Sequence, residues 1–246
     1  MNPGWYRENG RSFNQLIYAI LRKLDYSRLR LSSIEPCDVD EELAELSLHP
    51  RFCNYFHVPL QSGSREILRL MRRTYSAESY RKRLETVRRV NPAVFLGTDV
   101  IAGFPGESEA HFQETLDLLR DLDIVQVHGF PYSPREGTDA LELPNPVDRG
   151  VAKERVRRLQ EYSNGQWKKL VFGLEGQTRF AVIEKCDEEQ SLGSALSDDY
   201  IRIEFGLASR FDPANIQGRL GRFNLGQAAS DRSVKGDLIE LLPLSF

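Results

Sequence analysis

The chain has 246 residues, 40% hydrophobic and 28% charged, which is typical of a soluble globular protein with a substantial core. The net charge of −3 excludes an overall attraction to nucleic acid, so any basic surface has to be local. No apolar run approaches the ~20 residues of a membrane span. The N-terminal residues are polar and do not resemble a secretory signal. Cys37, Cys53 and Cys186 are too far apart for a metal cluster. We therefore expect a reducing, cytoplasmic location without disulfides or metal ligands.

Helical and strand patterns alternate through residue 130. An amphipathic helix is predicted from Phe13 to Leu24, and Asp38 is a plausible N-cap for the next helix. The alternation predicts a parallel sheet with right-handed crossovers, in which ligands bind at the carboxyl ends of the strands. The four predicted strands lie at 29–34, 56–60, 96–101 and 124–130.

The stretch 98–108 (TDVIAGFPGES) turns from a buried strand into a helix. Gly103 and Gly106 permit a positive φ or a close approach of the backbone, and Asp99 is a carboxylate in an otherwise apolar strand. Two interpretations remain open from spacing alone. One is a ligand-binding loop, and the other is an ordinary strand-to-helix turn with Asp99 at a strand edge.

Polar residues follow each of the four strands, which predicts that they converge on one rim of the sheet. The basic stretch 72–89 is interpreted mostly as a solvated helix face, although one arginine near the 61–64 turn is a candidate for an anionic ligand group. His57, inside a predicted strand, is interpreted as a hydrogen-bonded core histidine. The rim residues are Ser32 and Ser33, Gln61 and Ser62, Asp99 and Gly103, and Ser133 and Arg135.

The pattern changes in the second part of the chain. A charged helix over 148–170 is expected to lead away from the sheet, and short β-rich runs separated by polar loops follow it. Residues 184–199 are the least readable part. These runs predict a small all-β barrel, in which Arg202, Arg219 and Arg222 are candidate phosphate ligands. The runs lie at 178–183, 200–205, 219–223 and 237–242.

Several motifs together resemble the radical-SAM tRNA methylthiotransferases over residues 1–171. They are HVPLQSGS at 57–64 with MRR at 71–73, TDVIAGFPGE at 98–107 and YSPREGT at 132–138. LRLSSIEP at 29–36 resembles the branch that acts on N6-threonylcarbamoyladenosine at tRNA position 37. The β-module is similar in kind to the RNA-binding TRAM domain that ends these enzymes. The expected partner is therefore tRNA, and no membrane partner is expected.

The resemblance implies a transferase. In this family a [4Fe–4S] cluster on a CxxxCxxC motif cleaves S-adenosylmethionine, and sulfur from a second cluster is inserted at C2 of the adenine and methylated. It also implies cofactor-binding roles for particular residues. Ser33 matches a position that faces the methionyl part of S-adenosylmethionine, and Asp99 matches an acid that binds its ribose. Gly103 and Gly106 would let the backbone approach its adenine. The implied set is Ser33, Gln61, Ser62, Arg73, Asp99, Gly103 and Gly106.

The CxxxCxxC motif is absent from this sequence, and no catalytic residue is assigned. Because thiolates hold such clusters, we expect the chain alone to be inactive. It is expected to be a truncated gene product, the C-terminal half of a split protein whose N-terminal half is a separate chain, or the product of a misassigned start. The expected fold is an incomplete parallel (βα) barrel over 1–171 followed by a TRAM-like β-barrel over 172–246. The alternatives are a non-catalytic RNA-binding remnant and a fragment of a coproporphyrinogen-oxidase-type radical-SAM enzyme.

Overall fold

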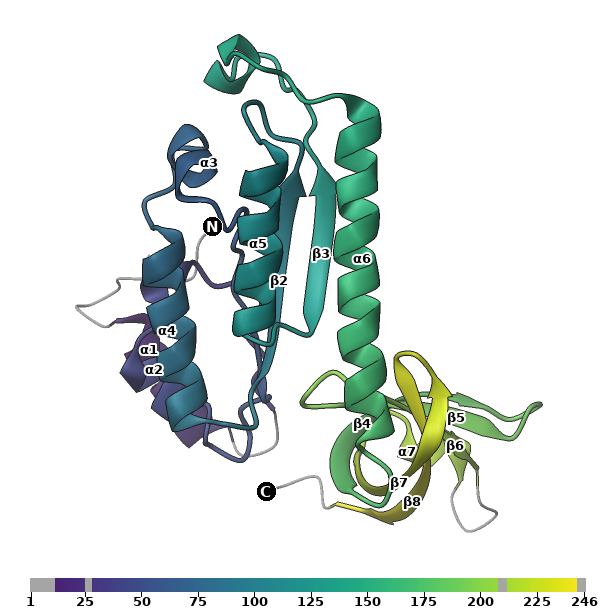
Figure 1. Cartoon of the computed structure of the whole chain (residues 1–246). Helices are drawn as coiled ribbons and strands as arrows, with labels where there is room; N and C mark the ends of the chain where they lie inside the picture. The colour runs from purple at the N-terminus through teal and green to yellow at the C-terminus, as the bar shows by residue number, and fades with distance from the viewer. Residues whose placement is uncertain (1–11, 25–27, 208–211, 243–246) are drawn as a thin grey trace.

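The structure, a computed structural model, describes residues 12–24, 28–207 and 212–242. Its first part is built around a three-stranded sheet in the order β1-β2-β3 (Figure 1). These strands are Tyr55–His57 (β1), Phe95–Ala102 (β2) and Gln126–Pro131 (β3). Both pairings are parallel, and Asp99 lies opposite His128. The prediction of a parallel sheet is confirmed for these three strands.

The first of the four predicted strands is not regular, which corrects that prediction. Leu29 pairs with Phe52 in a single parallel bridge, and the backbone N–H of Ile34 donates to the carbonyl of His57. Between these two points Arg30 reaches away from the sheet toward the C-terminal part of the chain. The segment therefore runs beside β1 in the parallel sense without forming a continuous ladder.

Helices α4 and α5 lie along one side of the sheet (Figure 1). Tyr80 and Phe112 from these helices are fully buried with the apolar side chains of β2 in the larger of two hydrophobic cores. The second helix does not begin at Asp38, because Asp38 ends a 3₁₀ turn and Asp40 caps the helix by accepting from the N–H of Leu43. The elements are α1 (Phe13–Lys23), η2 (Pro36–Asp38), α2 (Glu41–Leu46), α3 (Arg65–Leu70), α4 (Ala77–Val90) and α5 (Glu109–Asp121).

The second part of the chain forms a closed barrel with strand order β4-β5-β6-β8-β7. β6 and β8 pair in parallel and the other pairs are antiparallel. Phe205 and Phe223 fill the interior edge-to-face, with ring centroids 5.1 Å apart. The small all-β barrel is thus confirmed. Its elements are β4 (Thr178–Asp187), β5 (Leu192–Ser197), β6 (Arg202–Gly206), α7 (Pro213–Ile216), β7 (Leu220–Ser230) and β8 (Ser233–Leu241).

Helix α6 (Arg149–Phe172) connects the two parts. It does not lead away from the sheet, since Leu159 packs on Gly129 of β3 and the hydroxyl of Ser163 accepts from the N–H of Val127 (Figure 1). A short 3₁₀ turn, η3 (Asp139–Glu142), precedes it. Because β3 and α6 are in contact along their lengths, the helix holds the barrel at the end of the sheet where the strands begin.

The barrel packs against the amino ends of β1 and β2. Tyr55 and Phe95 share the second hydrophobic core with the barrel and with Trp167 of α6. Tyr200 stacks on Tyr55 at a centroid distance of 4.5 Å, and the guanidinium of Arg30 lies 4.2 Å from the Tyr200 ring. The barrel therefore lies at the opposite end of the sheet from the predicted ligand rim. In the described ranges, no helix has the length and apolarity needed to cross a membrane.

Candidate functional site

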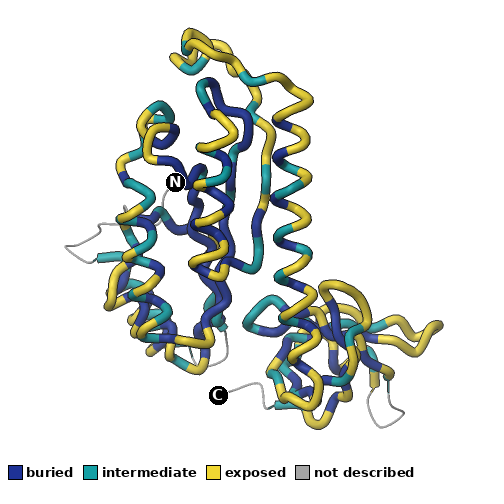
Figure 2. Tube along the Cα trace, viewed as in Figure 1, coloured by how far each residue is buried: buried dark blue, intermediate teal, exposed yellow. Residues whose placement is uncertain are grey.

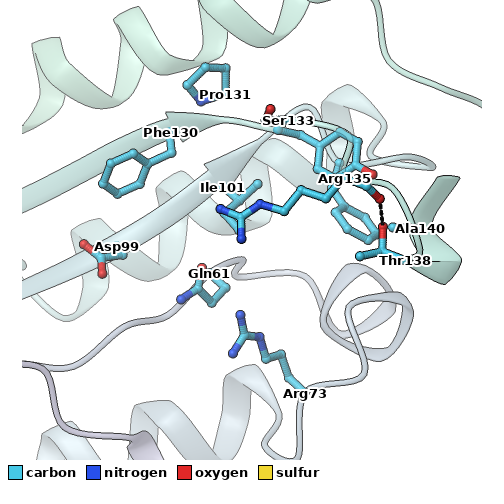
Figure 3. A pocket seen from close by; sticks show the side chains of 12 residues that line it. Gln61, Arg73, Asp99, Ile101, Phe130, Pro131, Ser133, Arg135, Thr138 and Ala140 are labelled. Carbon is cyan, nitrogen blue, oxygen red and sulfur yellow. Dashed lines mark hydrogen bonds between the residues drawn. The ribbon is translucent and has the colours of Figure 1, made fainter. Parts of the chain in front are cut away.

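A cavity of about 600 Å³ opens at the carboxyl ends of the strands (Figure 3). This volume falls in the range of small-molecule sites. Three of the predicted residues line it together: Gln61, Arg73 and Asp99. They come from three different segments of the chain, so their convergence follows from the parallel order of the sheet. Ile101, Phe104, Phe130, Pro131, Tyr132, Ser133, Arg135, Thr138 and Ala140 complete the lining.

Asp99 is held in place by a chain of hydrogen bonds on the inner face of the sheet. Its Oδ1 lies 3.0 Å from Nε2 of His57, and Nδ1 of His57 lies 2.9 Å from the hydroxyl of Tyr55. Gly97 makes room for this chain, because a Cβ there would lie 2.2 Å from the Tyr55 hydroxyl oxygen. Burial raises the pKa of Tyr55, so its hydroxyl keeps its proton beside Nδ1 of His57. The interpretation of His57 as a hydrogen-bonded core histidine is confirmed.

His128 of β3 lies beside this chain, with its ring centroid 5.6 Å from that of His57. Desolvation lowers the pKa of His128, and the neighbouring His57 lowers it further. The lowered pKa favours the neutral imidazole of His128, which lies opposite Asp99 in the register of β2 and β3. Asp99 lines the cavity, where its oxygens can accept from hydroxyl or ammonium donors.

Gln61 adopts φ +66°, a left-handed conformation that is uncommon for a residue other than glycine. Its backbone is fixed on both sides, since its N–H donates to the Asp99 carbonyl and its carbonyl accepts from the N–H of Ile101. This conformation turns the amide side chain into the cavity beside Asp99 (Figure 3). Strained backbone of this kind is often found at ligand sites.

Arg73 follows α3, and its guanidinium points toward Gln61, which lies between it and Asp99 (Figure 3). Its Nε is buried without a hydrogen-bond partner within the described residues. Most other cations of the 72–89 stretch are occupied: Arg72, Arg81, Lys82 and Arg89 form ion pairs, and Arg83 and Arg88 bond to backbone carbonyls. Arg73 is thus set apart as the arginine that an anionic ligand group can reach.

The two glycines of the 98–108 turn have positive φ as expected, +80° at Gly103 and +86° at Gly106. Neither lines the cavity of Asp99. A Cβ at Gly103 would lie 2.4 Å from Cβ of Ala152, so this glycine admits helix α6. At Gly106 the nearest atom would belong to Leu70. In the structure both glycines are explained by the turn and its packing, and their proposed contact with adenine stays a prediction.

Ser33 and Ser62 are also outside the cavity. Ser33 is exposed, and Ser62 is fully buried with its hydroxyl accepting from the N–H of Ser64. Of the four predicted rim positions, the structure therefore brings together Gln61 after β1, Asp99 within β2 and the loop after β3, and leaves out Ser32 and Ser33 of the irregular segment. Ser133 and Arg135, which the rim pattern named, do line the cavity.

A buried ion pair fixes the turn that forms one wall of the site. Glu107 and Arg155 are each 4% exposed, and Nη1 of Arg155 lies 2.7 Å from Oε2 of Glu107. The same oxygen accepts from the N–H of Gly103 at 2.6 Å. Burial raises the pKa of Glu107 despite these partners. This pair ties the turn to α6, and sequence reasoning missed it because the two residues are 48 positions apart.

The donor set of the cavity suits one of the two cofactors that the resemblance implies. An arginine with an unsatisfied buried nitrogen and an acid across a cavity of about 600 Å³ match the carboxylate and the hydroxyl or ammonium groups of S-adenosylmethionine. No cysteine is among the described residues that line this cavity. The described residues contain no group of three His, Cys, Asp or Glu side chains suited to a metal ion, and Cys37, Cys53 and Cys186 are separate free thiols.

The basic residues considered for RNA contact are largely engaged. Arg202 and Arg222 form ion pairs with Glu184 and Glu240, and Arg219 donates to the carbonyl of Leu242. In α6, Arg155, Arg157 and Arg158 also pair with glutamates. These contacts reduce the positive charge that the barrel and α6 present to a phosphate backbone.

Comparison with known proteins identifies relatives of this chain. Residues 7–119 match the model of the radical SAM superfamily. A threonylcarbamoyladenosine tRNA methylthiotransferase of Bacillus subtilis is 33% identical over 83% of this chain and 47% of that protein. A tRNA-2-methylthio-N(6)-dimethylallyladenosine synthase of Bacillus cytotoxicus is 33% identical over 94% of this chain and 46% of that protein. The chain is a relative of the radical SAM tRNA methylthiotransferases. The resemblance seen in the motifs is thereby confirmed.

The chain spans about half the length of the curated relatives it matches. Among solved structures, the coproporphyrinogen III oxidase of Escherichia coli, a radical SAM enzyme, superposes with a TM-score of 0.50. It is 14% identical, and the match covers 64% of this chain and 37% of that one. A likeness at this level of identity supports the radical SAM type of α/β fold and says nothing about the substrate.

Proposed function

We propose that the chain binds S-adenosylmethionine at the rim cavity and serves in methylthio transfer to C2 of N6-threonylcarbamoyladenosine at position 37 of tRNA. The observation that carries the proposal is the convergence of Gln61, Arg73 and Asp99 on one cavity in a relative of the methylthiotransferases. The relatives are named for two different adenosines, and the SSIEP run at 32–36 favours the threonylcarbamoyl form. A cytoplasmic location is part of the proposal, because the substrate is tRNA.

In this proposal Arg73 binds the cofactor carboxylate with its guanidinium, and Asp99 accepts from the ribose hydroxyls. Gln61 adds an amide that can donate and accept between them. Bound to a cluster, S-adenosylmethionine supplies an adenosyl radical. The thiolates for that cluster would come from residues outside this sequence, on the same or another polypeptide, because the sequence has no CxxxCxxC motif. We also propose that the chain by itself is inactive and that its barrel acts as a TRAM-like RNA-binding module.

The test is calorimetric titration of the purified chain with S-adenosylmethionine. We expect saturable binding that is about tenfold or more weaker in Arg73→Gln and Asp99→Asn, since a charged hydrogen bond contributes roughly 1.5–3 kcal/mol. Arg65→Gln, which removes an exposed arginine at the start of α3, is the matched control and should bind like the parent. Equal affinity in the parent and both site variants contradicts the assignment.

The activity is tested separately. The chain, reconstituted with iron and sulfide, should release no 5′-deoxyadenosine from S-adenosylmethionine, because the thiolate triad is missing from the sequence. Cleavage above background would show a ligand set that the motifs do not indicate. The non-catalytic alternative, an RNA-binding module alone, predicts tRNA binding without any binding of S-adenosylmethionine.

A further inference from the structure

The rim cavity has two arginines, and the cofactor can use only one of them. Arg73 and Arg135 both line the cavity, and their guanidinium groups point into it from opposite sides (Figure 3). Within the described part of the chain, neither forms an ion pair with a carboxylate. S-adenosylmethionine has a single anionic group, its carboxylate, together with an ammonium and a sulfonium. One guanidinium is therefore left for a different anion.

The two arginines differ in how they are held. Arg73 is half-buried at the end of α3, and its backbone N–H donates to the carbonyl of Leu68. Arg135 lies in the exposed segment between β3 and α6 and lines the cavity; most of this segment is exposed in Figure 2. A half-buried arginine with an unsatisfied nitrogen suits an enclosed small ligand, and an exposed one suits a group that belongs to a large, incoming molecule.

The backbone at Arg135 is held by hydrogen bonds within the loop. The hydroxyl of Thr138 donates to the carbonyl of Arg135 at 2.7 Å, and its N–H donates to the same oxygen at 3.3 Å. Gly137 closes this turn with φ +76°. The turn fixes the backbone from which the Arg135 side chain extends over the cavity (Figure 3).

There is space for a second ligand. A further cavity of about 470 Å³ adjoins the first and shares Arg73, Ile101, Phe104, Thr138 and Ala140 with it. Phe130, which is 50% exposed, also faces the first cavity and offers a ring on which a base can stack (Figure 3). Figure 3 shows the Phe130 ring on the same side of the cavity as Asp99, with the Arg135 guanidinium between this ring and the region of Arg73 and Thr138 that borders the second cavity.

We propose that Arg135 recognises an anionic group of the RNA substrate as the target adenosine enters the cavity. The proposal rests on the proposed function and extends it to the second substrate. Guanidinium binds a phosphodiester and a carboxylate equally well by paired hydrogen bonds. The anion is therefore either a backbone phosphate next to the target nucleotide or the carboxylate of the threonylcarbamoyl group.

The experiment uses the full chain and two 17-nucleotide anticodon stem-loop RNAs that differ only at position 37, which is adenosine in one and N6-threonylcarbamoyladenosine in the other. Kd values for both RNAs and for S-adenosylmethionine are measured with the parent, Arg135→Gln and Arg65→Gln. We expect Arg135→Gln to weaken RNA binding by about tenfold and to leave the Kd for S-adenosylmethionine within about twofold of the parent. Arg65→Gln controls for the loss of one exposed positive charge.

The two RNAs distinguish the two sources of the anion. Weakening of both RNAs to the same extent assigns Arg135 to a phosphate, and weakening of the modified RNA alone assigns it to the carboxylate. Unchanged RNA binding, a loss confined to S-adenosylmethionine, or a parent chain that binds neither RNA overturns the proposal. Failure of the proposed cofactor site has a different signature, which is an Arg73→Gln variant that binds S-adenosylmethionine as well as the parent.

Discussion

Nε2 of His57 lies 3.0 Å from Oδ1 of Asp99, and both side chains come from the inner face of neighbouring parallel strands. The imidazole is 11% exposed and the carboxylate 26% exposed, so the acid is open to a ligand on one side only. On its other side His57 is fixed by the Tyr55 hydroxyl. His57 is therefore a positioning residue, which sets the direction in which Asp99 presents its free oxygen.

Replacement of His57 by alanine should weaken S-adenosylmethionine binding by about threefold to tenfold, because Asp99 loses its donor while its charge remains. His57→Gln, whose amide can still donate to Asp99, should recover part of the affinity. Titration calorimetry with a thermal melt of each variant separates the loss of positioning from unfolding. A folded His57→Ala chain with the affinity of the parent would show that Asp99 needs no such partner.

The turn glycines give a second prediction. Gly103→Ala should destabilise the chain by about 2–4 kcal/mol, because it combines a strained φ with a contact of 2.4 Å to Ala152. Gly137→Ala is the matched control: its φ is +76°, and a Cβ there meets nothing within 4 Å. That variant should lose about 1 kcal/mol. Urea denaturation measures both, and equal losses would mean that packing against α6 adds nothing.

Much of the site could be predicted from the sequence, because strand-to-helix alternation determines which loops share a rim. Gln61, Arg73 and Asp99 were found in this way together with the motifs. Ser62, which the sequence also places at the rim, lies in the core instead, since the turn that exposes Gln61 directs the next side chain inward. Whether a side chain faces the cavity or the core depends on the alternation of side chains along the backbone. The positive φ of Gln61 interrupts this alternation.

The barrel shows a second limit of sequence reasoning. β5 was not predicted, because its inward positions are Gly193, Ala195 and Ser197 and not large apolar residues. A Cβ at Gly193 would lie 2.4 Å from the ring of Phe205. Small residues are needed opposite the aromatic rings in so narrow a barrel, and they remove the hydrophobic alternation by which strands are recognised.

Contact between barrel and sheet leads to a third prediction. Tyr200→Ala should cost about 2 kcal/mol in the free energy of unfolding, because it removes the contacts with Tyr55 and Arg30. Phe180→Ala, an exposed aromatic residue of the same barrel, should cost less than about 0.5 kcal/mol. Chemical denaturation followed by tryptophan fluorescence reports on the change, since Trp167 lies in the shared core. Similar losses in both variants would argue against a specific contact through Tyr200.

The Glu107–Arg155 pair predicts strong coupling between the turn and α6. Arg155→Met leaves a buried carboxylate without its cation and should destabilise by about 3–5 kcal/mol. Glu107→Leu combined with Arg155→Met removes both charges and should cost less than the two single changes added together. A double-mutant cycle in urea measures the difference. Additive losses would indicate that each residue acts through other neighbours.

The same pair gives stability a defined dependence on pH. Burial raises the pKa of Glu107 above that of the unfolded chain, so between these two pKa values the native state binds more protons than the unfolded state. The contribution of this group is therefore fully present below the unfolded pKa and is lost as pH rises through the folded pKa. The side chain introduced by Glu107→Gln cannot ionise, so this variant lacks the pH-dependent contribution to stability. The stability of the parent minus that of Glu107→Gln should accordingly be smaller at pH 7.5 than at pH 4.5. Glu109→Gln, an exposed change in the same segment, should leave the parent's pH profile intact. A parent-minus-Glu107→Gln difference that grows with pH would instead mean that Arg155 and the N–H of Gly103 outweigh burial and hold the pKa of Glu107 below its usual value.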